Sequence, residues 1–256
     1  MPPLAPSYYT SLKPFRALFK TGMPYLMYHK LGPRPRGARL KGLYLSTRLF
    51  ERQLAELRRA GFTTPRYGLP PGGVKEAKCI ALTFDDGFAN VFKHALEPLA
   101  RHQFRAIEFL VAGLIGRANQ WEIELGEVRE PLMDAAQVRE WLAAGHEIGS
   151  HTLTHPFLTR LNTRLAREEI SASKKKLEDL FGAPIRHFCY PYGDWNGAIR
   201  DLVAEAGYET ACTTDLGVNS AGARPLELKR IMSRYQSLSF KELGARLGRL
   251  KFRSRA

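Results

Sequence analysis

The sequence predicts an α/β protein, an irregular, TIM-like (β/α) barrel of about seven parallel strands that forms a single domain. Two observations predict this fold. Short apolar runs alternate with amphipathic helical patterns about seven times, and such alternation is typical of a parallel sheet with helical crossovers. The chain has 256 residues, a length that fits one closed barrel of roughly 200–250 residues.

The expected strands are short apolar runs bounded by Gly, Pro or polar residues. They cover residues 25–28, 78–84, 106–111, 146–150, 185–190, 208–213 and 226–232. Because the parallel strands of a barrel end at one mouth, we expect the functional residues in the loops that follow them.

Helical patterns fill most of the intervals between these strands. Ser46 is the expected N-cap of one helix, and Asp134 with Gln137 forms a capping box for another. Residues 113–131 have no clean period and indicate an insertion. Further helices are expected over residues 88–103, 163–181 and 197–206, with a last one from about Phe240.

Positive charge is concentrated at the two ends of the chain. The formal net charge is +14; residues 1–50 contain nine Lys and Arg and no acid, and residues 224–256 contain ten Lys and Arg with two Glu. We therefore expect a basic N-terminal extension (1–22), the barrel (23–238) and a basic amphipathic C-terminal helix or tail (239–256). The basic ends could bind an anionic membrane surface or pack on the barrel with their charges in water.

Composition excludes several classes of protein. Hydrophobic residues make up 44% of the chain and charged residues 25%, which excludes collagen-like and disordered chains. The three cysteines, Cys79, Cys189 and Cys212, are widely spaced, so we expect buried thiols rather than disulfides. The N-terminal residues do not resemble a signal peptide. We expect a cytoplasmic protein, with peripheral contact to the inner membrane face as an option.

Two adjacent carboxylates, Asp85 and Asp86, close the second expected strand within TFDDG (83–87). Unpaired buried charges are costly, so something must hold these side chains. A general base and a metal ligand would each use such a carboxylate. The alternative is a simple Asp-Gly turn that starts the next helix.

Two further polar clusters follow later strands. His151 and His155 in SHTLTH (150–155) could bind one metal if the segment makes a helical turn; core packing is the alternative. The turn YPYGDW (190–195) offers backbone N–H groups or is merely structural. One carboxylate with two imidazoles suits Zn²⁺ or a related ion, and a second carboxylate beside them suits a general base. Together the clusters predict metal-assisted hydrolysis.

These residues resemble the polysaccharide deacetylases, carbohydrate esterase family four, whose relatives include chitooligosaccharide deacetylases. The matching segments are LMYHKL (26–31), TFDDG (83–87), SHTLTH (150–155) and YPYG (190–193). The first of these is typical of the branch with exopolysaccharide deacetylases. The resemblance covers roughly residues 24–232 and implies a hydrolase that removes N-acetyl groups from N-acetylhexosamine residues of a poly- or oligosaccharide, with a lipid-linked glycan as an option.

The resemblance also implies roles for individual residues. Asp86, His151 and His155 would hold a divalent metal, foremost zinc, with Co, Mn or Ni as options. Asp85 would be the catalytic base. The backbone N–H of Tyr192 would stabilise the oxyanion.

The chain departs from the family pattern at two places. Many members have an Arg in the third motif that pairs with the base, where this chain has Cys189; we hypothesise that Arg230, in the last expected strand, orients Asp85 instead. No histidine follows His187, although the family usually supplies a general acid from a Leu-x-His segment near the C-terminus. His29 is the first candidate for this acid and His187 the second. A structural role for His29 is equally open.

Other functions remain open. A close variant would remove formyl from an amino sugar on a lipid carrier, and a barrel without activity could bind glycans. Nucleic acid is not an expected partner, because no nucleic-acid-binding motif accompanies the basic ends. Trp195 could flank a sugar ring, whereas we expect Trp141 in the core. The sequence does not indicate an oligomeric state.

Overall fold

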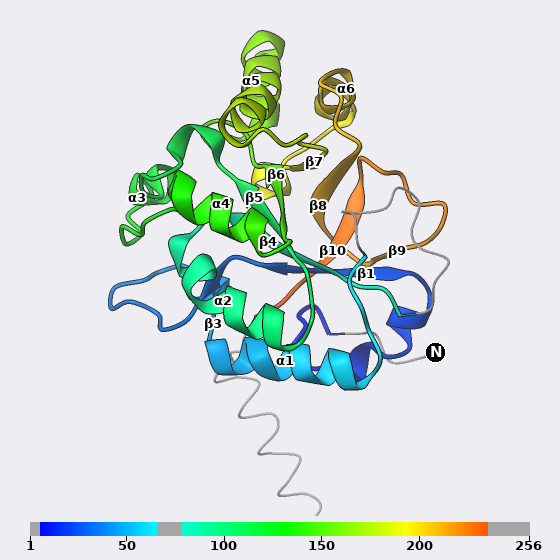
Figure 1. Ribbon diagram of the computed structural model, residues 1–256. Helices are drawn as coiled ribbons and strands as arrows, with labels where there is room; N and C mark the ends of the chain where they lie inside the picture. Colours follow the sequence, from blue (N-terminus) through cyan, green and yellow to red (C-terminus); the bar gives the residue numbers. More distant parts are fainter. Residues whose placement is uncertain (1–5, 66–77, 235–256) are drawn as a thin grey trace, which may run out of the picture.

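A computed structural model describes residues 6–65 and 78–234, and the predicted seven-stranded parallel barrel is confirmed (Figure 1). Strand β10 pairs with both β8 and β1, which closes the sheet. The barrel strands, in their order around the sheet, are β1 (Met23–Tyr28), β4 (Ala81–Asp86), β5 (Ile107–Leu110), β6 (Glu147–Ser150), β7 (His187–Cys189), β8 (Thr210–Leu216) and β10 (Leu228–Met232).

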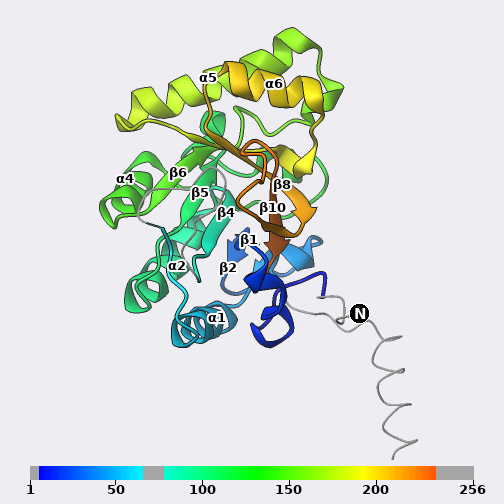
Figure 2. The same cartoon turned by 90° about the vertical axis from the view of Figure 1, so that its right-hand side faces the viewer.

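The main helices lie where their capping residues predicted. Ser46 Oγ accepts the Leu49 N–H at the start of the first helix, and Asp134 and Gln137 form the expected capping box. The helices between successive barrel strands pack outside the sheet, and Figure 2 shows α5 and α6 side by side. These helices are α1 (Thr47–Arg59), α2 (Ala89–Arg101), α4 (Ala135–Ala143), α5 (Thr163–Phe181) and α6 (Gly197–Glu205).

Several short elements were not predicted, because two or three residues are too few to show a period. Strands β2 (Lys30–Leu31) and β3 (Tyr44–Leu45) form a separate parallel pair, and β9 (Val218–Asn219) runs antiparallel to β1. The insertion contains the short helix α3 (Gln120–Ile123). The 3₁₀ turns are η1 (Lys13–Phe15), η2 (Leu18–Lys20), η3 (Lys41–Leu43), η4 (Ala112–Leu114), η5 (Leu158–Arg160) and η6 (Pro191–Gly193).

Alternation along the strands divides the apolar side chains into two layers. One layer, with Tyr25, Ala81 and Phe109, fills the barrel interior. The larger layer lies between the strands and the helices and includes Phe84 and Trp141. Because neighbouring residues of a strand point to opposite sides, Asp85 shares the inward side with Ala81 and lies at the carboxyl end of the barrel.

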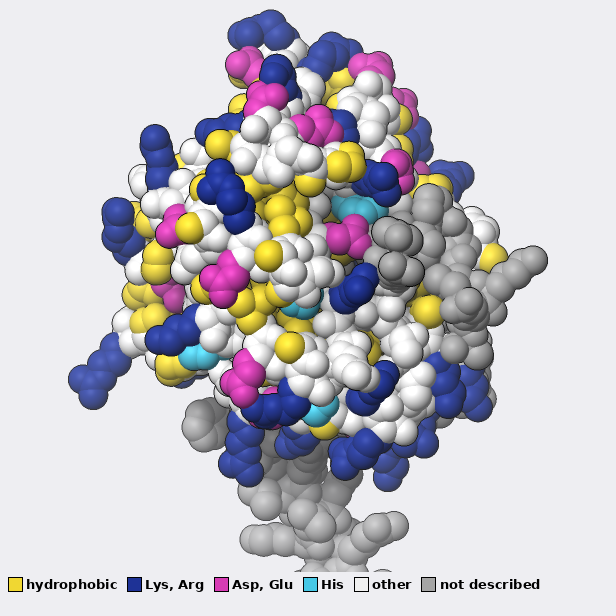
Figure 3. Space-filling view, in the orientation of Figure 1, with side chains coloured by type: hydrophobic (Ala, Val, Ile, Leu, Met, Phe, Trp, Pro, Cys, Tyr) yellow, Lys and Arg dark blue, Asp and Glu magenta, His cyan; other side chains and the backbone are white. Residues whose placement is uncertain are grey.

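The basic N-terminal segment packs on the barrel from residue 6 onward. Leu12, Phe15 and Phe19 are buried, whereas Lys13 and its neighbouring cations Arg16 and Lys20 are exposed. Figure 3 shows Lys and Arg side chains dense along the lower edge of the molecule, where α1 lies. The expected C-terminal helix over 239–256 lies outside the described residues. Among the helices of residues 6–65 and 78–234, none combines the length and apolarity needed to span a bilayer.

Candidate active site

The carboxylates of Asp85 and Asp86, at the end of β4, point in different directions because the backbone changes conformation at Asp86. This residue has a φ of 83°, in the left-handed region that non-glycine residues seldom adopt. Gly87 N–H donates to Glu108 Oε1 at 2.9 Å, which holds the turn. Burial raises the pKa of Glu108 well above its usual range. The turn presents Asp86 at the mouth, beside the inward-pointing Asp85.

The histidine pair comes from the loop after β6, which brings the two imidazoles together without forming a helical turn. Thr152 and His155 both have a φ of 68°, and Thr152 Oγ1 accepts the His155 N–H at 3.0 Å. Glu169 of α5 accepts the N–H groups of Leu153 and Thr154 at 2.9 and 3.0 Å. Two left-handed residues and a carboxylate from a neighbouring helix therefore bring the imidazoles together, where the sequence suggested a helical i, i+4 spacing.

Three lone-pair donors converge at the mouth. Asp86 Oδ1 lies 3.4 Å from His151 Nε2 and 3.3 Å from His155 Nε2, and the two nitrogens are 3.2 Å apart. A tetrahedral zinc ion with bonds of about 2.0–2.1 Å places its ligand atoms roughly 3.3 Å apart. The observed spacing of Asp86, His151 and His155 therefore fits a small divalent cation.

The tautomer and charge of these groups also suit a cation. His151 Nδ1 lies 2.8 Å from the Cys189 carbonyl oxygen; since a carbonyl only accepts, Nδ1 carries the proton and Nε2 is left for a metal. Burial would raise the pKa of Asp86, but whenever the two Nε2 atoms carry protons in place of a metal, their hydrogen bonds to the carboxylate hold its pKa well below the usual range. The carboxylate is thus ionised, as a ligand must be.

A second trio, Asp85, His151 and Cys189, is equally close but does not fit a metal. Arg230 Nη2 lies 3.1 Å from Cys189 Sγ and 2.8 Å from Asp85 Oδ2, so a cation already occupies this side. Burial raises the pKa of the Cys189 thiol to about 11, and a thiol must lose its proton to bind a metal.

Arg230 reaches Asp85 as the sequence hypothesis requires. Its Nη1 and Nη2 donate to Asp85 Oδ1 and Oδ2 at 2.7 and 2.8 Å, in a bidentate pair. Nε donates to the Thr213 carbonyl at 2.8 Å, and Nη1 also reaches Thr83 Oγ1. Burial would raise the pKa of Asp85, but Arg230 and His29 bring it below its ordinary value. The base is therefore kept ionised.

The two candidates for the general acid lie at opposite ends of the barrel. His29 Nε2 is 3.8 Å from Asp85 Oδ2, at the mouth. Burial lowers the pKa of His29, against the opposing effect of Asp85. His187 lies at the amino end of β7, where Nδ1 is 2.8 Å from Thr210 Oγ1 and Nε2 is 3.4 Å from Glu147. The second candidate is thus wrong, because β7 starts on the far side of the barrel.

Aromatic rings surround His155. Trp121 of α3 stacks on it at 4.5 Å between ring centroids, and Tyr192 meets it edge-on at 4.5 Å. Tyr192 has a φ of 60° and a side chain that is 40% exposed; Phe157 stacks on its ring at 3.9 Å. Sequence reasoning missed Trp121, and its only signal was a Trp inside the irregular insertion.

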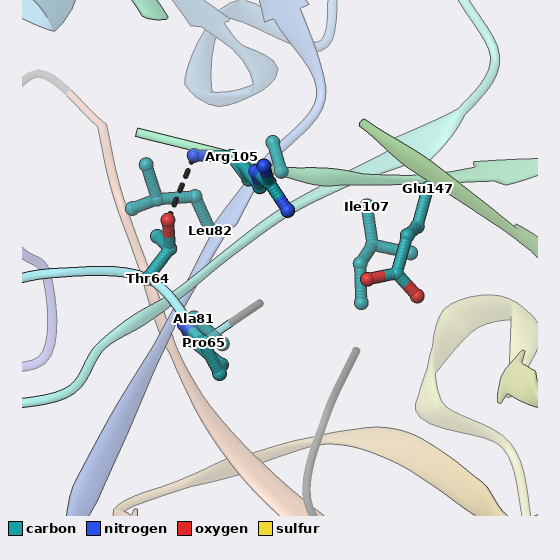
Figure 4. A pocket seen from close by; sticks show the side chains of 8 residues that line it. Thr64, Pro65, Ala81, Leu82, Arg105, Ile107 and Glu147 are labelled. Atoms are coloured by element: carbon teal, nitrogen blue, oxygen red, sulfur yellow. Dashed lines mark hydrogen bonds between the residues drawn. The ribbon is translucent and has the colours of Figure 1, made fainter. Parts of the chain in front are cut away.

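The two tryptophans considered from the sequence both contact side chains or backbone of the barrel. Trp195 stacks on Tyr190, and Trp141 is buried, as expected, with Nε1 donating to the Glu147 carbonyl. A separate hollow lies at the amino ends of β4, β5 and β6, as Figure 4 shows. Thr64, Arg105 and Glu147 line it. It is therefore on the opposite side of the barrel from the converging carboxylates and imidazoles.

Comparison with known proteins places the chain in a family. The model of the polysaccharide deacetylase family matches residues 55–211. The chain belongs to the polysaccharide deacetylase family. The prediction from the motifs is thus confirmed, and the predicted enzyme class, hydrolysis of an N-acetyl amide on a carbohydrate, is that of this family.

Named relatives cover different shares of the chain. It is similar to YxkH of Bacillus subtilis (strain 168), with 25% identity over 82% of this chain and 70% of that protein. It is also similar to the chitooligosaccharide deacetylase of Bradyrhizobium sp. (strain ANU 289), with 30% identity over 53% of this chain and 56% of that one. The chain thus spans little more than half of the rhizobial relative.

Solved structures share the barrel. The Streptococcus pyogenes deacetylase PplD, in complex with acetate, covers 88% of this chain and 97% of its own with a TM-score of 0.72 and 24% identity, a likeness of fold. IcaB from Ammonifex degensii covers 88% of this chain and 96% of its own, with a TM-score of 0.69 and 27% identity.

Proposed function

We propose that this protein is a metal-dependent N-deacetylase of a glycan that contains N-acetylhexosamine. The single observation that carries the proposal is the convergence of Asp86, His151 and His155 beside the buried Asp85–Arg230 pair. The names of relatives support a glycan substrate, since one is a chitooligosaccharide deacetylase. Zinc is the proposed ion, because two imidazoles and one carboxylate in tetrahedral spacing suit it.

The cation held by Asp86, His151 and His155 would supply Lewis acidity, which acidifies water and polarises the acetamide carbonyl. Asp85 takes a proton from the attacking water, and Arg230 keeps this carboxylate ionised and fixed in orientation. The water oxygen forms a bond to the acetyl carbon. The Tyr192 N–H donates to the developing oxyanion, a type of contact worth about 3–4 kcal/mol of barrier.

Collapse of the adduct breaks the carbon–nitrogen bond. His29 gives a proton to the departing nitrogen, and the products are acetate and a free amine on the sugar. The 3.8 Å between His29 Nε2 and Asp85 Oδ2 supports this role, because it puts the imidazole at the mouth of the barrel beside the proposed base. General acid–base groups in such positions contribute roughly 10²–10⁴-fold each.

The test is metal analysis of the purified protein followed by product assays. We expect about one zinc per chain and release of acetate from N-acetylated oligosaccharides, with Asp85→Asn as the matched variant that binds metal and loses turnover. Release of formate from a formylated lipid-linked amino sugar, with no acetate from any acetylated glycan, would replace the proposal by the deformylase. Binding of glycan without either product would leave a glycan-binding barrel.

A further inference from the structure

A buried lysine next to His29 connects β2 to the insertion. Lys30 is fully buried, and its Nζ lies 2.6 Å from Glu122 Oε2 and 3.1 Å from Glu130 Oε2. Both carboxylates belong to the insertion, which contributes nothing to the proton transfers proposed above. Buried charges persist only when they are paired and hydrogen-bonded, so this contact holds the insertion at a defined place against β2.

Neighbouring polar groups complete the anchor. Asn119 Nδ2 donates to Glu122 Oε2 at 2.7 Å, and Asn90 Nδ2 donates to Glu130 Oε1 at 3.2 Å. Tyr44 Oη donates to Glu130, and the Lys30 ammonium lies 4.3 Å from the centroid of the Phe88 ring. The lysine thus joins β2, β3, α2 and the insertion at one buried point.

The anchored segment carries the ring that packs on His155. Trp121 directly precedes Glu122 in α3, so fixing the Glu122 carboxylate also fixes the direction of the indole. The indole is buried and lies nearly parallel to the imidazole, with 26° between the ring planes. A shift of α3 would therefore move the wall of the metal-ligand site.

The orientation of the His155 ring depends on packing against Trp121 more than the orientation of His151 does. Metal-ligating histidines usually donate their outer N–H to a polar partner, which sets the ring orientation. His151 has such a partner in the Cys189 carbonyl. The outer Nδ1 of His155 is buried and, within residues 6–65 and 78–234, has no hydrogen-bond partner. Packing against Trp121 and Tyr192 takes the place of that bond.

We propose that Lys30 is a positioning residue, whose ion pairs with Glu122 and Glu130 hold Trp121 on the His155 ring and keep Nε2 directed at Asp86. The inference rests on the proposed function, because it takes His155 Nε2 to be a metal ligand. It assigns the insertion the task of orienting that ligand. It also explains why His29 and Lys30 are adjacent, since one strand end then places both the proton donor and the anchor.

The experiment compares cobalt binding in Lys30→Met, Trp121→Ala and the double variant. We expect each single variant to raise the cobalt dissociation constant by about 10–100-fold, the usual effect of losing an outer partner of a metal ligand. The double variant should bind no more weakly than Trp121→Ala alone, since both changes remove the same support. Lys175→Met, which removes an exposed ion pair with Asp179, is the matched control and should match the wild type.

A second measurement is independent of the metal. In the metal-free protein, His155 should react faster with diethylpyrocarbonate in Lys30→Met than in the wild type, while His151 should not change. If Lys30→Met does not fold, the triple variant with Glu122→Gln and Glu130→Gln removes the unpaired carboxylates and undergoes the same tests. Unchanged His155 reactivity, or additive losses of cobalt affinity, would overturn the inference. A wild type that binds no cobalt, with faster His155 modification in Lys30→Met, would instead count against the proposed function alone.

Discussion

Replacement of Arg230 by Met removes the cation that faces the proposed base while keeping a long apolar side chain. Both Arg230 and Asp85 are buried, and the guanidinium makes two hydrogen bonds to the carboxylate and further ones to Thr213 and Thr83. Breaking a buried pair by removing one partner costs about 3–5 kcal/mol, compared with about 0–1 kcal/mol for an exposed pair. We therefore expect Arg230→Met to lower the free energy of unfolding at pH 7 by about 3–5 kcal/mol.

The pH dependence has a definite sign. In the wild type the folded-state pKa of Asp85 lies below its ordinary value, so the pair stabilises the fold at neutral pH and loses this effect as the pH falls through the folded-state pKa. Without Arg230, burial raises the pKa of Asp85. The variant should therefore be most destabilised at pH 7 and approach the wild type in acid. The low-pH limb of its pH–rate profile should move to higher pH.

Urea unfolding at pH 7 and pH 4 and pH–rate profiles measure both effects. The matched variant combines Arg230→Met with Cys189→Arg, which returns the arginine to the position where many family members carry it and should recover part of both losses. Arg230→Lys should restore the positive charge beside Asp85 but not the fixed orientation of its carboxylate, because lysine lacks the bidentate fork of arginine. The reasoning is refuted if Arg230→Met unfolds within about 1 kcal/mol of the wild type and keeps its turnover and pH profile.

Four further predictions concern the metal, the acid, the fold and the basic surface. His155→Ala should weaken zinc binding by more than the roughly 10–100-fold that an outer partner contributes, and retention of one zinc per chain after dialysis would contradict the assignment. His29→Ala should lower turnover by about 10²–10⁴-fold and remove the alkaline limb of the pH–rate profile, since a general acid is lost as pH rises through its pKa; survival of that limb would exclude His29. Burial lowers the pKa of His146 to about 4. Because only the unfolded state takes up a proton at this residue between pH 6.5 and 4, His146 destabilises the fold by up to about 3 kcal/mol as the pH falls through this range. In urea unfolding, the His146→Gln variant should therefore lose less stability in acid than the wild type does. Anionic lipid vesicles should co-sediment with the protein at low salt and release it at high salt, and absence of binding at low salt would remove the membrane from the expected partners.

Local sequence signals predicted the barrel well. Apolar runs, the Ser46 cap and the Asp134–Gln137 capping box depend on residues within a few positions of each other, so they can be seen along the chain. The paired strands β2 and β3 could not be predicted, because two residues show no alternation and their pairing depends on distant partners. The order of the motifs identified the family for the same reason: their spacing is a property of the chain itself.

The site divides along the same line. The residue types of Asp85, Asp86, His151 and His155 are enough to predict metal-assisted hydrolysis, since two carboxylates and two imidazoles at strand ends suit a metal site with a general base. Which of these side chains lie next to one another could be seen only in the folded structure. The histidines meet through two left-handed residues, and His187 proved remote because strand direction, not sequence distance from the motif, sets the end of the barrel.

The sequence by itself determined the family, the barrel and the chemical types at its mouth, because periodicity, caps and motif spacing are local. Only the tertiary structure decided that Arg230 forms a bidentate pair with Asp85, that His29 faces the base, and that Lys30 pairs with Glu122. Those contacts join residues up to 145 positions apart. Their energies come from burial and geometry that exist only once the barrel has closed.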